Sequence, residues 1–549
     1  MDKRTLFALI LIFAIFWLSN RFLWQRSTPD QSDTETVTTE MISPQEPYND
    51  EESYLSSMRM PEDDQLLSDR SRELFDRGDI QIRDDILLEN DLVELYFSNR
   101  GGVLNAVHLK NYFHYDKFNL VNLIPEGASI FGLEMETVDD FYMFDDYVFN
   151  WENTIIDNHQ ALIFYLENQG QRLIEKKFVI NDDYALTYNI QASGLGNIRD
   201  YVVSFNSGIA DTEEKPKHKN TDYRFIGQIQ NSRNVLQLRR IQENIRLTGN
   251  VDWAAIRSKY FIMVLLPEQR LLTDNVTVFV QNESPAFDVT ITPGRAISQL
   301  NDYYDVYLGP LDYQHLKRYG IGLEETIEMG WKIIRPVSRL FLWLLTTLNK
   351  FFGNYGVTII FFALILKIIL YPLTHKSFES SIKMQRMSPH MQEIQKKYKS
   401  DPKQMQVELQ KLYKEHGVNP LGGCLPLLLQ MPIFFALYPV LRYSIELRQA
   451  SFMLWLTDLS EPSNIILPAL MGIFMFIQQK MMMPKHIDKE KMDEKQLAQM
   501  QSQKMMLYIM PVFLVFIFSS LPSGLVLYWT VFNVFSIIQQ YYVKKKYSH

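Results

Sequence analysis

The chain has 549 residues, of which 46% are hydrophobic and 22% are charged, an average that is ordinary for a water-soluble protein. Its net charge of -9 argues against a general nucleic-acid binder, and its single cysteine, Cys424, excludes an intramolecular disulfide framework. The average conceals an uneven distribution, because long uncharged runs gather after residue 350 while the middle of the chain is polar and acidic.

The N-terminus predicts a membrane anchor. Lys3 and Arg4 precede an unbroken apolar run from Leu6 to Leu18. A cleaved secretory signal has the same flank and core, but the bulky residues that follow do not suit a cleavage site, so we expect a retained signal anchor over 1–26. The acidic segment 27–84 has little apolar periodicity, and we expect a disordered linker there.

Short alternating stretches over 85–320 predict an antiparallel β-sandwich. Leu92–Phe97 and Val103–Val107 read as two strands joined by the turn Gly101-Gly102. Further strands are expected over 161–166, 172–180, 185–192, 201–206 and 275–281. The histidines show no metal-ligand spacing, and acidic pairs such as Asp139-Asp140 indicate solvated turns rather than acid–base groups. We therefore expect that the protein is not an enzyme, and that it has neither catalytic residues nor a cofactor.

Cations interleave with aromatic and aliphatic residues over 321–350, which predicts an amphipathic helix lying in the membrane interface. The alternative is a helix packed on the β-domain. Five hydrophobic segments then predict a five-helix membrane core over 351–543. They cover 351–373, 421–440, 465–477, 507–521 and 525–543.

The charges of the loops predict the orientation of these spans. Nine Lys or Arg residues lie between Thr374 and Asn419, six lysines lie over 480–504, and the tail 544–549 holds three more. Cytoplasmic loops carry such an excess, so both termini are expected in the cytoplasm and the β-sandwich in the periplasm of a bacterial inner membrane.

A cytoplasmic αα-hairpin is predicted over 374–417. Apolar residues recur at helical spacing on both sides of Asp401-Pro402 and form a narrow seam. The seam residues are Met387, Met391, Ile394, Met405 and Leu409. The charged faces of the hairpin either are solvated or meet a partner, and the sequence favours neither.

Lys367 is the one ionisable residue that stands away from the ends of the five segments. An ammonium at the bilayer centre costs about 2.5–3.5 kcal/mol on insertion scales, so such a residue normally faces a wet cavity or a partner. No Asp or Glu lies within these segments, and we therefore expect a positive charge that can receive a visiting anion. The alternative is that the long side chain snorkels to the cytoplasmic headgroups.

Several motifs resemble the YidC/Oxa/Alb family of membrane protein insertases, and Gram-negative YidC in particular. They are Gly417 through Phe434, Tyr371-Pro372-Leu373-Thr374, Glu446 through Ala450, Phe518 through Tyr528, and Asn99-Arg100-Gly101-Gly102. The resemblance implies a hydrophilic groove open to the cytoplasm and to lipid. The groove residues that it implies are Lys367, Ala363, Gln430, Phe434, Tyr528 and Trp529. Lys367 stands where the family usually has arginine, and Trp529 where a tyrosine is expected.

The resemblance implies an insertase that helps nascent membrane proteins into the lipid bilayer, alone or with the Sec translocon. The cytoplasmic hairpin would recruit the substrate and meet the translating ribosome. A secondary transporter or channel for a small solute is the alternative from another class, but the paired repeats typical of transporters are not visible. A third alternative is a periplasmic carbohydrate-active enzyme on a membrane anchor. Such an enzyme would need one anchor and would leave the five further spans unexplained.

Overall fold

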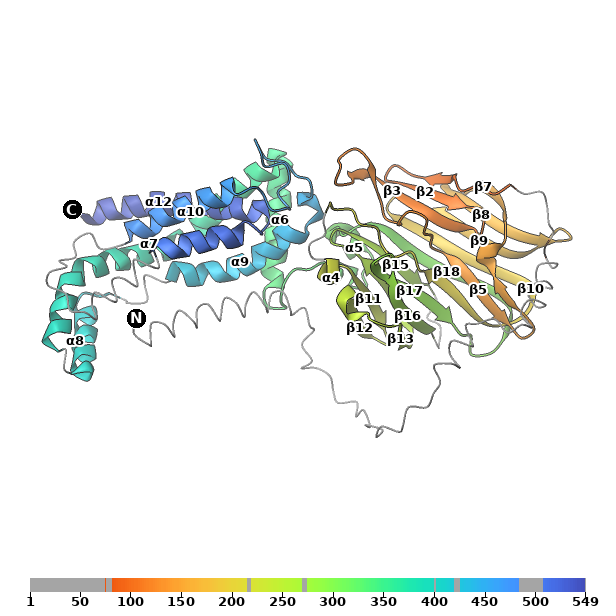
Figure 1. The fold of residues 1–549 in the computed structure, drawn as a ribbon, viewed down its shortest axis with the longest axis horizontal. Helices are drawn as coiled ribbons and strands as arrows, with labels where there is room; N and C mark the ends of the chain where they lie inside the picture. Colours follow the sequence, from red (N-terminus) through yellow and green to blue (C-terminus); the bar gives the residue numbers. More distant parts are fainter. Residues whose placement is uncertain are drawn as a thin grey trace, which may run out of the picture. The chain divides into compact units, whose positions relative to one another are not determined.

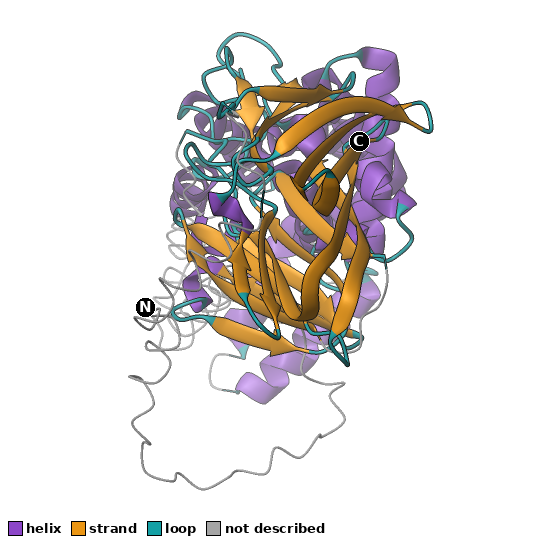
Figure 2. Ribbon diagram, turned by 90° about the vertical axis from the view of Figure 1, so that its right-hand side faces the viewer, coloured by secondary structure: helices purple, strands orange, loops and turns teal. Residues whose placement is uncertain are grey.

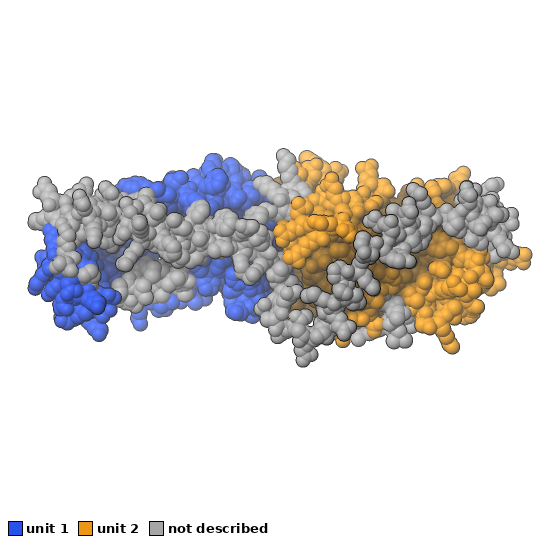
Figure 3. Space-filling view, turned by 60° about the horizontal axis from the view of Figure 1, so that its bottom comes forward, with its two compact units in different colours: residues 1–45, 327–549 blue, residues 46–326 orange. Residues whose placement is uncertain are grey.

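The computed structural model describes Phe75 and residues 81–214, 219–268, 274–398, 401–418, 425–482 and 507–548. The signal anchor expected over 1–26 and nearly all of the linker expected over 27–84 lie outside the described residues. The chain forms two compact units, residues 46–326 and residues 1–45 with 327–549, which are coloured separately in Figure 3. We call the described residues of the first the β-domain and those of the second the helical unit.

A small antiparallel sheet opens the β-domain. Its strands follow the order of the chain: β1 (Ile86–Glu89), β2 (Val93–Ser98), β3 (Val103–Phe113) and β4 (Leu120–Asn122). Gly101 and Gly102 have φ of 77° and 56°, a conformation that side chains disfavour, so the Gly-Gly pair permits the turn between β2 and β3. The hairpin expected from the sequence is confirmed.

A 14-stranded antiparallel sheet forms the rest of the β-domain (Figure 1). Its main path runs β12-β11-β14-β15-β18-β10-β17-β16-β13, and β5 to β9 attach to β10 and to one another. The bounds are β5 Gly132–Thr137, β6 Phe141–Met143, β7 Asn150–Ile156, β8 His159–Asn168, β9 Gln171–Ile180, β10 Ala185–Phe205, β11 Arg224–Ile229, β12 Ser232–Gln237, β13 Ile245–Thr248, β14 Val251–Arg257, β15 Phe261–Pro267, β16 Asp274–Gln281, β17 Ser284–Ile291 and β18 Ile297–Pro310. Figure 2 shows the strong twist of the longer strands. A right-handed twist is normal for β-strands.

The two sheets bury an aromatic core between them. Phe97 of β2 lies 4.7 Å from Phe178 of β9, whose ring stacks at 4.7 Å on Tyr188 of β10. Phe131 adds a third contact to Tyr188 at 4.8 Å. Each aromatic side chain removes a large apolar area from water, so this cluster is the centre of the β-sandwich. The sandwich fold expected from the sequence is confirmed.

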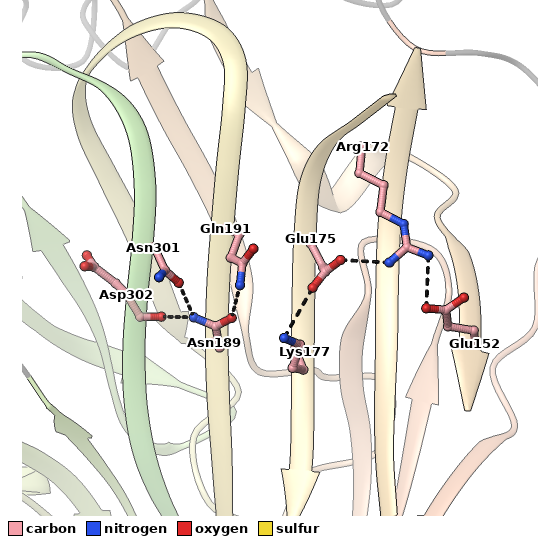
Figure 4. A network of polar contacts seen from close by, with 8 residues as sticks. All are labelled: Glu152, Arg172, Glu175, Lys177, Asn189, Gln191, Asn301 and Asp302. Atoms are coloured by element: carbon pink, nitrogen blue, oxygen red, sulfur yellow. Dashed lines mark hydrogen bonds and ion pairs between the residues drawn. The ribbon is translucent and has the colours of Figure 1, made fainter. Parts of the chain in front are cut away.

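Two groups of polar side chains on the large sheet bond to one another (Figure 4). Asn189 donates from Nδ2 to Asn301 Oδ1 and to the carbonyl of Asp302, and its Oδ1 accepts from Gln191. An unpaired buried amide would be costly, and these bonds remove that cost. A second row on the same face joins charged side chains of β7 and β9: Arg172 to Glu152 and Glu175, and Lys177 to Glu175.

Two strands expected over 185–192 and 201–206 are one strand, β10. The register of β10 against β18 shifts between Ser193 and Ile198, where Gly194 and Gly196 have φ of 74° and 92°. The sequence predicts two separate strands here, but the glycines form an irregularity that bends one continuous strand without ending it.

The helical unit contains α6 Arg335–Phe352, α7 Tyr355–Lys397, α8 Pro402–Glu415, α9 Leu425–Tyr443, α10 Ile466–Met481, a helix over Leu507–Phe518, and α12 Ser523–Ser548. α12 packs against α7 and α10, and α6 packs against α7 and α9 (Figure 1). Of the described helices, α7 is long and apolar enough to cross a membrane, while α10 and the helix Leu507–Phe518 are shorter apolar helices. The five-span core therefore stays a prediction.

The expected hairpin corresponds to the end of α7 and to α8. The helix runs through Pro372 and Thr374 without a break, so the apolar segment and the first arm of the hairpin form one helix of 43 residues. Asp401 caps α8 by accepting from the backbone N–H groups of Lys403 and Gln404. Gly417, with φ of 59°, follows the end of α8.

Candidate functional site

Lys367 lies inside the helical unit, on the face of α7 that meets α12. Its side chain is only 5% exposed. The ammonium Nζ donates to Ser536 Oγ at 2.7 Å and lies 4.7 Å from the ring centre of Phe532, both on α12. Phe378, three turns further along α7, is 5.7 Å away. A snorkelling lysine would expose its charged end, so this geometry does not fit the alternative in which Lys367 reaches out to the headgroups.

The positive charge has no carboxylate partner among the residues that the structure describes. Its surroundings are a hydroxyl and two aromatic faces, which attract a cation more weakly than a carboxylate does. An ammonium in such a site keeps unused capacity to bind an anion.

A small cavity adjoins the ammonium. Four helices contribute polar side chains to its wall: Lys367 and Thr374 from α7, Gln430 from α9, Gln478 from α10 and Ser536 from α12. The centre of a water molecule can move within about 20 Å³ there, which is enough for about one water. The cavity is therefore polar and can be hydrated.

Buried amides near the cavity have hydrogen-bonding atoms without a partner in the described part of the chain. These atoms are Nε2 of Gln430, Nδ2 of Asn533, and both Nε2 and Oε1 of Gln540. Asn533, Ser536 and Gln540 recur on α12 at spacings of three and four, so they share one face of the helix. A second, smaller cavity is lined by Gln540 together with Ser381, Gln385 and Lys544. Polar groups thus continue along α7 and α12 from Lys367 toward the C-terminal end of α12.

The aromatic residues that the resemblance implies form two groups. Phe434 of α9 lies 5.7 Å from Trp529 of α12, and Phe518 lies 5.1 Å from the same indole. Tyr528 is fully buried and lies 5.8 Å from Phe532, the ring next to the ammonium. Ala363 is also fully buried, four residues before Lys367 on α7. Lys367 and Gln430 therefore share a cavity, whereas Trp529 and Phe434 form a separate apolar cluster.

The seam residues of the hairpin differ in burial. Met387 is buried, and Met391, Ile394, Met405 and Leu409 are partly buried. α7 and α8 pack together. The other faces are charged, with Lys411 bonded to Glu408 at 2.7 Å.

The sequence reasoning missed three partners of Lys367. Ser536, Phe532 and Phe378 were not singled out. The polar positions 533, 536 and 540 on the last apolar segment carried a usable signal, because their spacing places them on one helical face. Nothing in the sequence alone brings that face to Lys367. Among the described residues, no three His, Cys, Asp or Glu side chains gather closely enough to hold a metal ion.

Comparison with known proteins assigns both parts of the chain. The family model of the YidC periplasmic domain matches residues 85–344, and that of the 60Kd inner membrane protein matches residues 347–549. The membrane protein insertase YidC of Chlorobium limicola is 32% identical over 500 residues, which cover 83% of this chain and 82% of the relative. The chain belongs to the YidC family of membrane protein insertases.

Other YidC proteins match along almost the whole chain. The membrane protein insertase YidC of Pelobacter propionicus is 30% identical, with 99% of each chain covered. A crystal structure of an active YidC insertase with its first transmembrane domain resolved is 20% identical, covers 87% of this chain and 97% of its own, and has a TM-score of 0.37. The resemblance inferred from the motifs is confirmed: the chain is a YidC-type inner membrane protein with a periplasmic β-domain.

Proposed function

We propose that this chain inserts membrane proteins into the bacterial inner membrane, and that Lys367 receives the acidic end of the segment that must cross. The observation that carries the proposal is the enclosed ammonium of Lys367, which lies beside a polar cavity and has no carboxylate partner among the described residues.

The energetic problem of insertion lies in the polar tail of the substrate. A carboxylate or ammonium at the bilayer centre costs about 2.5–3.5 kcal/mol on insertion scales, and more on an isolated helix. A site that offers an opposite charge and hydrogen-bonding groups part of the way across lowers that barrier. The apolar helix of the substrate supplies the driving force when it enters lipid, since the sequence carries no phosphate-binding loop for nucleotide hydrolysis.

The cavity region offers the required chemistry. The ammonium of Lys367 attracts a carboxylate, and the amides of Gln430 and Gln540 can bond to a polar backbone. Trp529 and Phe434 present apolar and aromatic surface on the same helices. We propose that a substrate hairpin opens this region between the helices, holds its tail beside Lys367, and passes into lipid.

The same proposal includes the topology and the partners. Five spans over 351–543, an N-terminal anchor and cytoplasmic ends place the lysine-rich segments in the cytoplasm, in agreement with the positive-inside rule. The α7–α8 hairpin, with its charged outer faces, would then meet the translating ribosome or the Sec translocon. Its seam residues, from Met387 to Leu409, hold the two helices together.

The proposal is tested by replacing Lys367 with alanine and with arginine in the full chain. Insertion into vesicles is measured for a substrate with an acidic translocated tail and for the same substrate with the tail neutralised. We expect Lys367→Ala to slow insertion of the acidic form about tenfold, equivalent to about 1.4 kcal/mol, and the neutral form much less. Lys367→Arg keeps the charge and should retain most of the activity.

Lys350→Ala is the matched control, because Lys350 lies exposed at the end of α6. It should insert both substrates normally. Equal insertion of the acidic substrate by wild type and Lys367→Ala would remove Lys367 from the mechanism.

A further inference from the structure

The turn between β3 and β4 carries an exposed group of aromatic residues. Phe113, Tyr115 and Phe118 are 43%, 48% and 87% exposed. We call residues 113–119 the aromatic loop. Single exposed apolar residues need no explanation, but three aromatic rings on one short turn form a concentrated apolar tip.

The aromatic loop is held in one conformation by its own hydrogen bonds. Asp116 Oδ1 accepts from the backbone N–H groups of Phe118 and Asn119 at 2.8 and 2.9 Å. The backbone N–H of His114 donates to the carbonyl of Asn119, and that of Lys117 donates to the carbonyl of His114. These bonds fix the turn, so the exposure of Phe118 follows from the backbone and not from a loosely packed segment.

The loop lies at the end of the β-domain from which the chain continues to the helical unit. Tyr112, just before the loop, packs edge-on against Phe261 at 5.6 Å. Phe261 pairs with Pro310 at the end of β18, and the nearby Arg257 donates to the carbonyl of Thr326, the last residue of the β-domain. Figure 1 shows the loop after β3 and helix α5 (Tyr313–Arg318) at the same end of the β-domain.

A short piece of chain joins this end of the β-domain to the helical unit. Residues 327–334 separate Thr326 from the start of α6, and eight extended residues span at most about 30 Å. α6 itself presents apolar side chains outward, with Leu340 and Trp343 more than half exposed. The bilayer is therefore the apolar phase that the connectivity brings within reach of the aromatic loop.

We propose that the aromatic loop inserts into the headgroup region of the periplasmic leaflet and anchors the β-domain on the membrane surface. Aromatic side chains are enriched at this depth, where their rings meet both lipid and water. The exposed Lys117 adds a cation beside the lipid phosphates, while the carboxylate of Asp116 is engaged by the loop backbone.

The shape of the loop favours lipid over a protein partner. A stable protein interface buries about 800 Å² on each side with a complementary surface. A convex turn of seven residues presents much less than that, whereas a bilayer accepts a narrow aromatic tip without a matching pocket. Anchoring would fix how far the β-domain can tilt away from the membrane.

The chain offers a clean way to measure this depth, because Cys424 is its only cysteine. In the full chain with Cys424→Ala, a nitroxide label is attached at Phe118→Cys. The matched control is Val138→Cys. Val138 is 45% exposed, and its neighbour Thr137 pairs with Ile198 of β10. Ile198 also pairs with Ile297, the first residue of β18, whereas the aromatic loop lies near Pro310, the last residue of β18. The control position is therefore at the opposite end of this strand.

Both proteins are reconstituted into vesicles of phosphatidylethanolamine and phosphatidylglycerol, with a water-soluble nickel chelate present on both sides. Power-saturation EPR then compares the accessibility of each label to the chelate and to oxygen, which concentrates in lipid. We expect the ratio of oxygen to nickel accessibility to be several-fold higher at position 118 than at position 138. Phe118 is so exposed that its replacement should not disturb folding.

Two outcomes would overturn the proposal. Equal nickel accessibility at both positions would place the aromatic loop in water. Protection of position 118 from both reagents would place it against protein. Either result would leave the proposed role of Lys367 in insertion untouched.

Discussion

The ammonium of Lys367 donates to the hydroxyl of Ser536, 169 positions later in the chain, across a distance of 2.7 Å. The hydroxyl in turn donates to the carbonyl of Phe532 at 2.8 Å, so it is turned with its lone pairs toward the lysine. One hydrogen bond thus joins the charge on α7 to α12. A substrate carboxylate would compete with this neutral acceptor, because it adds the attraction between opposite charges to the hydrogen bond. The site can therefore hold its charge at rest and still exchange partners.

Removing the hydroxyl should weaken the helical unit. In Ser536→Ala the buried ammonium loses its acceptor, and an unsatisfied buried charged group costs at least about 1–3 kcal/mol. Thermal unfolding in detergent should show a lower midpoint than wild type. Thr530→Val is the control on the same helix, since among the described residues the Thr530 hydroxyl bonds to the carbonyl of Val526, four residues before it on α12. The prediction fails if Ser536→Ala and Thr530→Val unfold together with wild type.

Gly356, in the first turn of α7, should not tolerate a side chain. A Cβ there would lie 2.1 Å from the ring of Phe452, far inside van der Waals contact. Overpacking of this kind costs about 1–3 kcal/mol, so Gly356→Ala should lower the unfolding midpoint of the helical unit. Gly294→Ala provides the comparison, because a Cβ at Gly294 meets no atom within 4 Å. Wild-type stability of Gly356→Ala would show that Phe452 moves freely.

The β-domain contains a buried lysine whose charge is costly. Lys176 is fully buried, and its ammonium donates to the carbonyls of Gly101 and Phe131 at 2.7 and 2.8 Å. Burial lowers the pKa of Lys176 from 10.5 to about 8, although Asp145 acts in the opposite direction. Between these two pKa values the unfolded chain binds more protons than the folded one. The contribution of this group to stability therefore rises with pH across that window.

This linkage predicts a pH-dependent difference between wild type and Lys176→Met. From about pH 7.5 to about pH 9.5, wild type should gain about 2 kcal/mol relative to the variant in the free energy of unfolding of the β-domain. The urea midpoint can be followed in the full chain by brief proteolysis and detection of the β-domain fragment. A difference that stays constant with pH would mean that Lys176 keeps its ordinary pKa in the folded state.

Features set by local interactions could be predicted from the sequence, whereas features set by contacts between distant residues could not. The β2–β3 hairpin was predictable because its signals, alternation and Gly101-Gly102, are local. The continuity of β10 was not, because Gly194 and Gly196 are typical of a turn, and only the pairing of β18 on both sides of them keeps the strand continuous. The position of α8 was readable from the cap Asp401-Pro402, whereas the unbroken passage of α7 through Pro372 reflects packing that overrides a local helix breaker.

The candidate site shows the same division. A lone lysine in an apolar segment indicated that Lys367 needs an unusual environment, because the cost of a buried charge follows from the residue type alone. The identity of that environment did not follow. Ser536 and Phe532 are ordinary residues of another helix, and only the packing of α12 on α7 brings them to the ammonium.

Two neighbouring residues of α7 can show whether a substrate passes along the cavity or along the exposed surface of the helix. Leu370 lines the cavity beside Lys367, while its neighbour Ile369 is 62% exposed on another face of the helix. A photo-reactive diazirine residue is placed at either position, and ribosome-bound chains of a membrane protein are stalled during insertion. We expect strong crosslinks to the nascent chain from position 370 and mainly lipid adducts from position 369.

The pair is matched in depth, so a difference between the two positions reports only the face of the helix. Adding Lys367→Ala should reduce the crosslinks at 370 for a substrate with an acidic tail and leave those of a neutral tail largely unchanged, because only the former is drawn by charge. Equal crosslinking from 369 and 370 would mean that the substrate passes along the lipid-facing surface of α7. The cavity would then be a structural feature of the helix packing, and the charge of Lys367 would need a different explanation.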